Sequence, residues 1–330
     1  MKVLVANNFL FEKGGSETFC YALIQELKRM GHDVEYFTFF KGEVSEKIEI
    51  DLEVSYMSKS KYDLILANHY TCVRYLAHRG KIIQTCHGIF SSLEQPSKYA
   101  DGYVSISEEV ANHLLKQGIK SRIIHNGINC DRYCIKTPLS IQLNKVLSLC
   151  QSDTANAALK DACELLEVNF KQLNKYKNPI WDVEDAINEA DLVVGLGRSA
   201  YEAMACGRNV LVFDKRKYSE SYSDGYLNQG NINNSIINNC SGRFYKKKLN
   251  VKELVIELQK YNPQDGFFLR NYALDNLNIK IQVEKYFEYS ETLSNASSVN
   301  LYFIMCFQYL KYIKKILKKK INIFFSITRA

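Results

Sequence analysis

Short apolar runs alternate with amphipathic stretches along most of the chain. Apolar runs bounded by polar residues predict buried strands, and apolar positions that repeat every three or four residues predict helices between them. In the first half, the predicted strands are Lys2–Ala6, Asp33–Phe39, Tyr62–Ala67, Lys81–Cys86, Tyr103–Ile106 and Ser121–His125. The clearest helices are Ser16–Met30 and Ser107–Lys116, the second with Ser107 as its N-cap. This alternation predicts a parallel sheet covered by helices on both faces.

The pattern breaks at a predicted turn, residues 126–129, and shows no clear period until residue 144. It then starts again, with predicted strands Lys145–Cys150, Leu192–Val194 and Val210–Phe213 and predicted helices Ala155–Leu166, Val183–Glu189, Val251–Tyr261 and Ile279–Tyr289. We therefore expect an α/β protein with two Rossmann-like domains that face a cleft, in residues 1–127 and 128–291. A cleft between two such domains suits a ligand that bridges them.

The segment 192–214 predicts an anion-binding site. A strand runs into a glycine turn, Gly195 and Gly197, and a helix then begins near Ser199. Glycines let the backbone approach a ligand, and the free amides of a helix N-terminus attract negative charge. The spacing Gly195-x-Gly197-x-x-Ala200 also fits a dinucleotide fingerprint, with Asp214 at the distance expected for a ribose contact. An NAD-dependent dehydrogenase is therefore one alternative.

The hexapeptide EAMACG at 202–207 resembles the donor-site helix of retaining glycosyltransferases of the family-4 type, which have the GT-B fold. Further segments resemble that family in the same order along the chain. These are Lys13-Gly14-Gly15-Ser16-Glu17, Thr85-Cys86-His87-Gly88 and Asn126-Gly127-Ile128-Asn129, the last with asparagine in place of the family's aspartate. The resemblance extends over residues 1 to about 290.

The resemblance implies transfer of a hexose from a nucleotide-sugar donor to a glycan or lipid-linked acceptor. It implies that the reaction retains the anomeric configuration and needs neither a metal nor a cofactor. In its terms, Glu202 binds the donor ribose, His87 reaches toward the donor sugar, and Gly14 and Gly15 face the diphosphate. We expect Gly195, Gly197 and Ser199 to offer backbone amides to the same diphosphate.

The chain departs from the family at two places. Val194 stands where members commonly have a first glutamate that helps to hold the sugar, and Cys150–Asp153 lacks the usual cations. Arg198, at the N-terminus of the helix, is our candidate to replace these cations, because a guanidinium binds a diphosphate through two parallel hydrogen bonds. Lys160, Lys215 and Arg216 are weaker candidates. The missing glutamate leaves a second alternative, an inactive GT-B protein that only binds glycans.

The net charge of +7 is concentrated at the C-terminal end. Residues 292–330 contain seven cations and no acidic side chain, so residues 1–291 are neutral, which argues against nucleic acid as a partner. Apolar residues in this basic tail recur at helical spacing: Phe303, Phe307, Leu310, Ile313 and Leu317. We expect an amphipathic helix that binds an anionic membrane surface, since the uncharged stretch is too short to span a bilayer.

The ten cysteines are scattered and lack the spacing of a zinc site. The chain opens on a predicted buried strand instead of a secretory signal, so we expect reduced thiols and a cytoplasmic location, peripheral at the inner face of the membrane where the tail binds.

Overall fold

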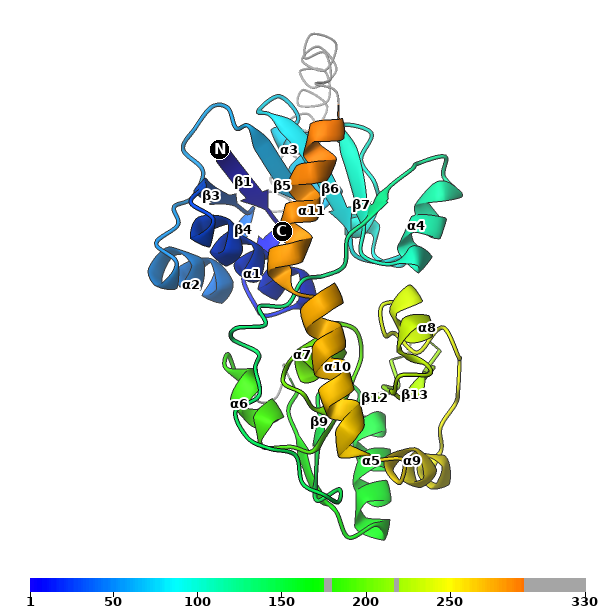
Figure 1. Cartoon of the computed structure of the whole chain (residues 1–330). Helices are drawn as coiled ribbons and strands as arrows, with labels where there is room; N and C mark the ends of the chain where they lie inside the picture. Colours follow the sequence, from blue (N-terminus) through cyan, green and yellow to red (C-terminus); the bar gives the residue numbers. More distant parts are fainter. Residues whose placement is uncertain (175–179, 217–219, 294–330) are drawn as a thin grey trace, which may run out of the picture.

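The computed structural model describes residues 1–174, 180–216 and 220–293. They form two α/β domains, one above the other in Figure 1, with two long helices running along one side of both. The two helices are α10 (Pro263–Asn276) and α11 (Ile279–Thr292). The predicted pair of Rossmann-like domains is confirmed.

The first domain is built on a six-stranded, fully parallel sheet. Its strand order is β3 (Asp33–Phe37), β1 (Lys2–Ala6), β5 (Leu64–Ala67), β6 (Lys81–Cys86), β7 (Gly102–Ser105) and β8 (Arg122–Ile123). Its helices are α1 (Gly15–Arg29), α2 (Glu43–Asp51), α3 (Tyr70–Leu76), η1 (Ser92–Glu94) and α4 (Glu108–Leu115). Two short strands, β2 (Phe9–Leu10) and β4 (Phe40–Lys41), pair beside the sheet.

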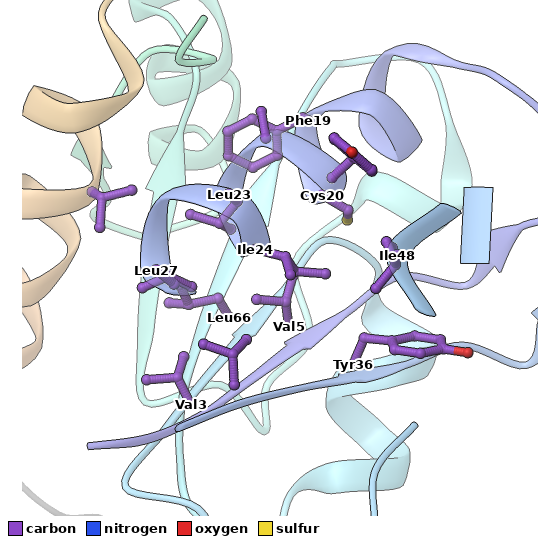
Figure 2. Close-up of a cluster of buried hydrophobic side chains, with 14 of the residues drawn as sticks. Val3, Val5, Phe19, Cys20, Leu23, Ile24, Leu27, Tyr36, Ile48 and Leu66 are labelled. Atoms are coloured by element: carbon purple, nitrogen blue, oxygen red, sulfur yellow. The ribbon is translucent and has the colours of Figure 1, made fainter. Parts of the chain in front are cut away.

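The core of this domain lies between the sheet and α1 (Figure 2). The buried face of α1 repeats at helical spacing and contains Phe19, Cys20, Leu23, Ile24 and Leu27. These side chains pack on strand residues Val3, Val5, Tyr36 and Leu66 and on Ile48 of α2. Because all six strands are parallel, their carboxyl ends meet at one edge of the sheet, where folds of this type bind their ligands.

The second domain repeats the plan on a five-stranded sheet. Its order is β10 (Asn169–Gln172), β9 (Lys145–Ser148), β11 (Leu192–Gly195), β12 (Asn209–Val212) and the antiparallel edge strand β13 (Gly225–Tyr226). Its helices, besides α10, are α5 (Asp153–Leu165), α6 (Val183–Asn188), α7 (Arg198–Ala205), α8 (Ile232–Ile237) and α9 (Val251–Leu258).

The chain crosses between the domains twice, and the two crossings lie side by side. The amide of Ile128 donates to the carbonyl of Leu277 at 2.8 Å, and the amide of Ile279 donates to the carbonyl of Ile128 at 2.9 Å. A Cβ at Gly127 would lie 2.7 Å from the Cα of Ile279, so only glycine permits this approach.

Helix α11 packs on the first domain, whereas the predicted boundary at residue 291 placed it in the second. Val283 and Tyr286 are buried in the same core as α1, and the Tyr286 hydroxyl lies 2.8 Å from that of Thr85. The apolar pattern predicted the helix correctly, but periodicity contains no information on which sheet a helix covers. The second domain therefore ends at the crossing near residue 278, and α11 completes the first.

Four helices were not predicted: α2, α3, α8 and α10. In α10 only Gly266, Leu269 and Ala273 are buried, so its apolar period is weak. In the described part of the chain, no helix is long and apolar enough to cross a bilayer. The predicted tail helix, with Phe303 and Leu317, lies outside the described residues.

We expect Val283→Ala to lower the free energy of unfolding by about 2 kcal/mol, because it leaves a cavity in the first-domain core. Urea unfolding measures the change, and hydrogen exchange locates it: amides of α1 should exchange faster while those of α7 do not. Glu288→Ala, on the exposed face of α11, is the control. Faster exchange in α7 instead of α1 would contradict the assignment of α11 to the first domain.

Candidate functional site

A cavity of about 760 Å³ lies between the two domains. Both domains line it, and they do so with the loops that follow their parallel strands. Seven of the eight predicted site residues line this cleft: Gly14, Gly15, His87, Gly197, Arg198, Ser199 and Glu202. The sequence motifs, although far apart along the chain, are thus brought to one place.

Helix α1 presents its N-terminus to the cleft from the first domain. Its first intrahelical bond runs from the Thr18 amide to the Gly14 carbonyl at 3.0 Å, so the three amides before Thr18 have no partner within the helix. A Cβ at Gly15 would meet nothing within 4 Å, whereas one at Gly14 would lie 2.1 Å from Oε2 of Glu17. Gly15 therefore borders open space, and Gly14 makes room for the Glu17 carboxylate.

Helix α7 presents a second N-terminus from the opposite wall. Gly197 is its N-cap, with φ of 57°, a left-handed conformation that favours glycine. The Gly197 amide donates to the Cys240 carbonyl at 2.9 Å, and the first intrahelical amide is that of Tyr201. The amides of residues 198–200 are consequently the ones left without an intrahelical partner.

Gly195 does not line the cleft, contrary to its predicted role. It ends β11 and is buried, and a Cβ there would lie 3.0 Å from the Cβ of Ser199. The glycine is needed because the strand and the start of α7 pack closely, so Gly195 supports the anion-binding turn without facing a ligand.

Arg198 and Glu202 form an ion pair inside the cleft. Nε of Arg198 lies 2.9 Å from Oε1 of Glu202, and the two side chains are 11% and 10% exposed. Nη1 of Arg198 donates to the carbonyl of Gly127, at the first crossing, at 3.1 Å. The pair therefore links α7 to the domain junction. Arg198, predicted to bind the diphosphate, and Glu202, predicted to bind the ribose, contact each other directly.

Burial raises the pKa of Glu202, and Arg198 opposes that shift. Tyr133, which also lines the cleft, opposes the rise in the pKa of Glu202 as well. A carboxylate paired with Arg198 in a poorly hydrated wall is well ordered, as a hydrogen-bond acceptor for ligand hydroxyls has to be.

His87 lies on the first-domain wall, directly after β6. Its Nε2 is 2.9 Å from Oδ1 of Asn68, and its ring packs edge-on against Phe19. Burial and the neighbouring His69 lower the pKa of His87 to about 3, so the imidazole is neutral at physiological pH. A neutral imidazole serves as a hydrogen-bonding group here and not as a cation for phosphate.

Cationic side chains outnumber acidic ones on the cleft wall. Arg198, Arg216 and Arg243 line it from the second domain and Lys13 from the first, whereas the acids are Glu94 and Glu202. Lys160, a weaker candidate, instead lies on the outer face of α5, 3.6 Å from Glu164, and Lys215 does not line the cleft either. The surplus of cations suits an anionic ligand.

Two sequence features have structural roles away from the ligand. Val194 is completely buried in β11, so no side chain from that position reaches the cleft. Asp214 is also fully buried, and it accepts from the amides of Gln151 and Ser152 and from Nε of Arg216. Asp214 therefore binds the start of α5, which removes the ribose contact on which the dehydrogenase alternative depended.

The sequence did not reveal several cleft residues. Trp181, the sole tryptophan of the chain, lies in the cleft wall, its ring 5.1 Å from Tyr21 of the first domain. Arg243 spans the domains, with Nε 2.7 Å from Oε1 of Glu109. No motif surrounds these residues, and only the folded chain brings them to the cleft.

We expect Arg198→Ala to lower the free energy of unfolding by about 3 kcal/mol, because the buried Glu202 carboxylate loses its ion-pair partner. Adding Glu202→Gln should recover part of that loss, since a neutral amide is less costly to bury. Urea denaturation of the wild type, both single variants and the double variant gives the coupling free energy. Changes that simply add, within about 0.5 kcal/mol, would contradict a stabilising pair.

Comparisons with known proteins agree with this architecture. Residues 54–132 match the model of a family described as Glycosyltransferase Family 4. No curated protein matches the chain by sequence.

Two solved structures share the two-domain fold. One is AviGT4, a glycosyltransferase involved in avilamycin A biosynthesis, at 14% identity and a TM-score of 0.53, covering 88% of this chain and 97% of that one. The other is an α-glucosyltransferase in complex with UDP and a 13-mer DNA containing an HMU base, at 10% identity and a TM-score of 0.52, covering 88% and 100%. The chain thus shares the fold of these glycosyltransferases, and residues 54–132 within it are similar to Glycosyltransferase Family 4.

Proposed function

We propose that this protein is a glycosyltransferase that takes a hexose from a nucleotide-sugar donor and transfers it, with retention and without a metal, to a glycan or lipid-linked acceptor. The observation that supports the proposal most directly is the cleft, where two helix N-termini and a surplus of cations meet between the domains. The family match and the UDP complex of a protein with this fold favour a nucleotide-sugar donor.

In this proposal the diphosphate lies at the N-terminus of α7. The free amides of residues 198–200 and the Arg198 guanidinium stabilise the negative charge that develops on the departing diphosphate. Within the described residues, Nε and Nη1 of Arg198 are hydrogen-bonded while Nη2 is not, so Nη2 is available for a phosphate oxygen. One such donor contributes ~3 kcal/mol to transition-state stabilisation.

Glu202 binds the donor ribose, and neutral His87 donates to or accepts from a sugar hydroxyl. The absence of a carboxylate at Val194 means that other groups of the cleft recognise the sugar. The neutral charge of residues 1–291 argues against nucleic acid as a partner, whereas the DNA complex of one protein with this fold argues for it.

We expect UDP or another nucleoside diphosphate to raise the Tm and to change the fluorescence of Trp181, because that side chain lies in the cleft wall. Arg198→Ala should weaken nucleoside diphosphate binding by roughly 10- to 100-fold, the loss of a hydrogen bond to a charged group. Binding of the nucleoside alone should change much less. Titrations followed by Trp181 emission, below the Tm of the variant, measure both.

Lys160→Ala is the matched control, since it removes a cation from the outer face of α5. Unchanged diphosphate affinity in Arg198→Ala would remove that residue from the donor site. Failure of every nucleoside diphosphate to bind would contradict the proposed function itself.

We further propose that the basic tail, residues 292–330, holds the protein at an anionic membrane surface, close to a lipid-linked acceptor. The support is its seven cations without an acidic residue and the helical spacing of its apolar side chains. Each cation near an anionic surface contributes about 1 kcal/mol.

Deleting residues 299–330 should therefore release the protein from anionic vesicles in a flotation assay, while leaving nucleoside diphosphate binding intact. Raised salt should release the full chain as well, because the attraction is electrostatic. Vesicle binding that survives the deletion would refute the role of the tail.

A further inference from the structure

Three neutral polar side chains of the cleft lining each have an oxygen without a partner. Oδ1 of Asn126, Oδ1 of Asn239 and Oγ of Ser241 are shielded from solvent and make no hydrogen bond within the part of the chain that the structure describes. Asn126 and Ser241 are each only 7% exposed. A buried polar atom without a hydrogen bond destabilises the folded state, so stability does not account for these three. Their shared place in the cleft indicates contacts with a ligand instead.

The turn that contains Asn239 and Ser241 is otherwise held firmly by the second domain. The fully buried Asp224 carboxylate accepts from the amide of Gly242 at 3.3 Å and from that of Tyr245 at 2.9 Å. Asn239 itself has a φ of 57°, a left-handed conformation that costs free energy for a residue other than glycine. The two unpaired oxygens therefore belong to a turn whose backbone is fixed by other contacts.

This turn extends from the start of α7 to the first domain. At one end, the Gly197 amide donates to the Cys240 carbonyl at 2.9 Å, and a Cβ at Gly197 would lie 3.3 Å from Nδ2 of Asn239. At the other end, Arg243 bonds Glu109 of α4, which lies above α8 in Figure 1. A sugar joined to a diphosphate at the N-terminus of α7 is therefore within reach of the turn.

Asn126 borders the same space from the domain junction. It precedes Gly127, whose carbonyl accepts from Nη1 of Arg198 at 3.1 Å, and it lines the cleft together with Arg198 and His87. Val194, at the position where the family's first glutamate is expected, is completely buried and offers no group to a sugar. The three unpaired oxygens are consequently the described groups best placed to replace that carboxylate.

We propose that Asn239, Ser241 and Asn126 bind the hydroxyls of the donor sugar, and that this sugar is an uncharged hexose. The assignment rests on the proposed function and deepens it by naming the class of sugar and the residues that select it. A sugar hydroxyl both donates and accepts, so it suits a carboxamide or a serine hydroxyl in either orientation. Rotation about a side-chain bond aims each group at the ligand and leaves the backbone in place.

The charges of the cleft favour an uncharged sugar over a sugar acid. Each arginine of the lining is already paired with a carboxylate: Arg198 with Glu202, Arg216 with Asp214, and Arg243 with Glu109. A sugar carboxylate would have to compete with one of these partners, whereas hydroxyls bound by the three neutral side chains displace no ion pair. The selectivity therefore follows from hydrogen bonding and not from charge.

The affinity for a nucleotide sugar, divided by that for its own nucleoside diphosphate, isolates the contribution of the sugar. The probes are UDP-glucose, UDP-galactose and GDP-mannose, each compared with UDP or GDP by titration of Trp181 emission. The wild type should bind at least one of these sugars. For that sugar, Ser241→Ala and Asn239→Ala should each lower the ratio by roughly 3- to 10-fold, the loss of one hydrogen bond. The affinity for the nucleoside diphosphate alone should stay within about twofold of the wild type.

Thermal unfolding of the free protein separates ligand binding from a structural role. Ser241→Ala should leave the Tm unchanged or raise it, because the hydroxyl that it removes has no partner. Ser235→Ala is the contrasting variant and should lower the Tm, since its hydroxyl lies 2.5 Å from Oδ2 of Asp224. Asn233→Ala, on the exposed face of α8, is the matched control and should change neither the Tm nor the ratio.

The outcomes separate this inference from the proposed function. An unchanged ratio in Ser241→Ala and Asn239→Ala, or an equal loss of affinity for the sugar nucleotide and the nucleoside diphosphate, would overturn the role of these side chains. Binding of nucleoside diphosphates but of none of the three uncharged sugars, or a preference for UDP-glucuronate over them, would overturn the class of sugar. Failure of UDP, GDP and every other nucleoside diphosphate to bind would overturn the proposed function, and this inference with it.

Discussion

The close approach of the two chain crossings between the domains determines the geometry of the cleft. Gly127 lies so near Ile279 that a side chain at position 127 would collide with its backbone, and Ile128 exchanges backbone hydrogen bonds with the returning chain. The carbonyl of Gly127 also receives a hydrogen bond from Arg198. One glycine therefore connects the junction of the domains to the start of α7, and the position of α7 sets that of the anion-binding amides.

The two walls of the cleft differ in chemistry because they come from different domains. The second domain contributes three arginines and a helix N-terminus, which suit a charged leaving group. The first domain contributes neutral His87, which suits hydroxyl groups, together with Lys13, Glu94 and the N-terminus of α1. Such a division lets a single cleft bind negative charge and hydroxyl groups next to each other, while burial keeps both kinds of group away from bulk water.

Much of the fold could be predicted from the sequence, because strands of a parallel sheet are continuous apolar runs and the helices between them repeat regularly. The glycine turns at Gly14 and Gly197 could also be predicted from the local sequence, because each glycine stands directly before a helical pattern. What could not be predicted depends on contacts between distant segments. The Arg198–Glu202 pair, the buried role of Asp214, the strand-end packing of Gly195 and the cleft position of Glu94 all follow from tertiary packing.

Helix α11 has a consequence for the order of events during synthesis. Its residues complete the core of the first domain, with Val283 and Tyr286 beside α1, yet they leave the ribosome only after the entire second domain has been made. Domains ordinarily fold as units, the N-terminal one first, as the chain emerges. Here the nascent first domain has an uncovered apolar strip throughout translation of the second, so its core is completed only after the second domain has been made. A chain that terminates before α11 leaves an incomplete first domain exposed to proteolysis.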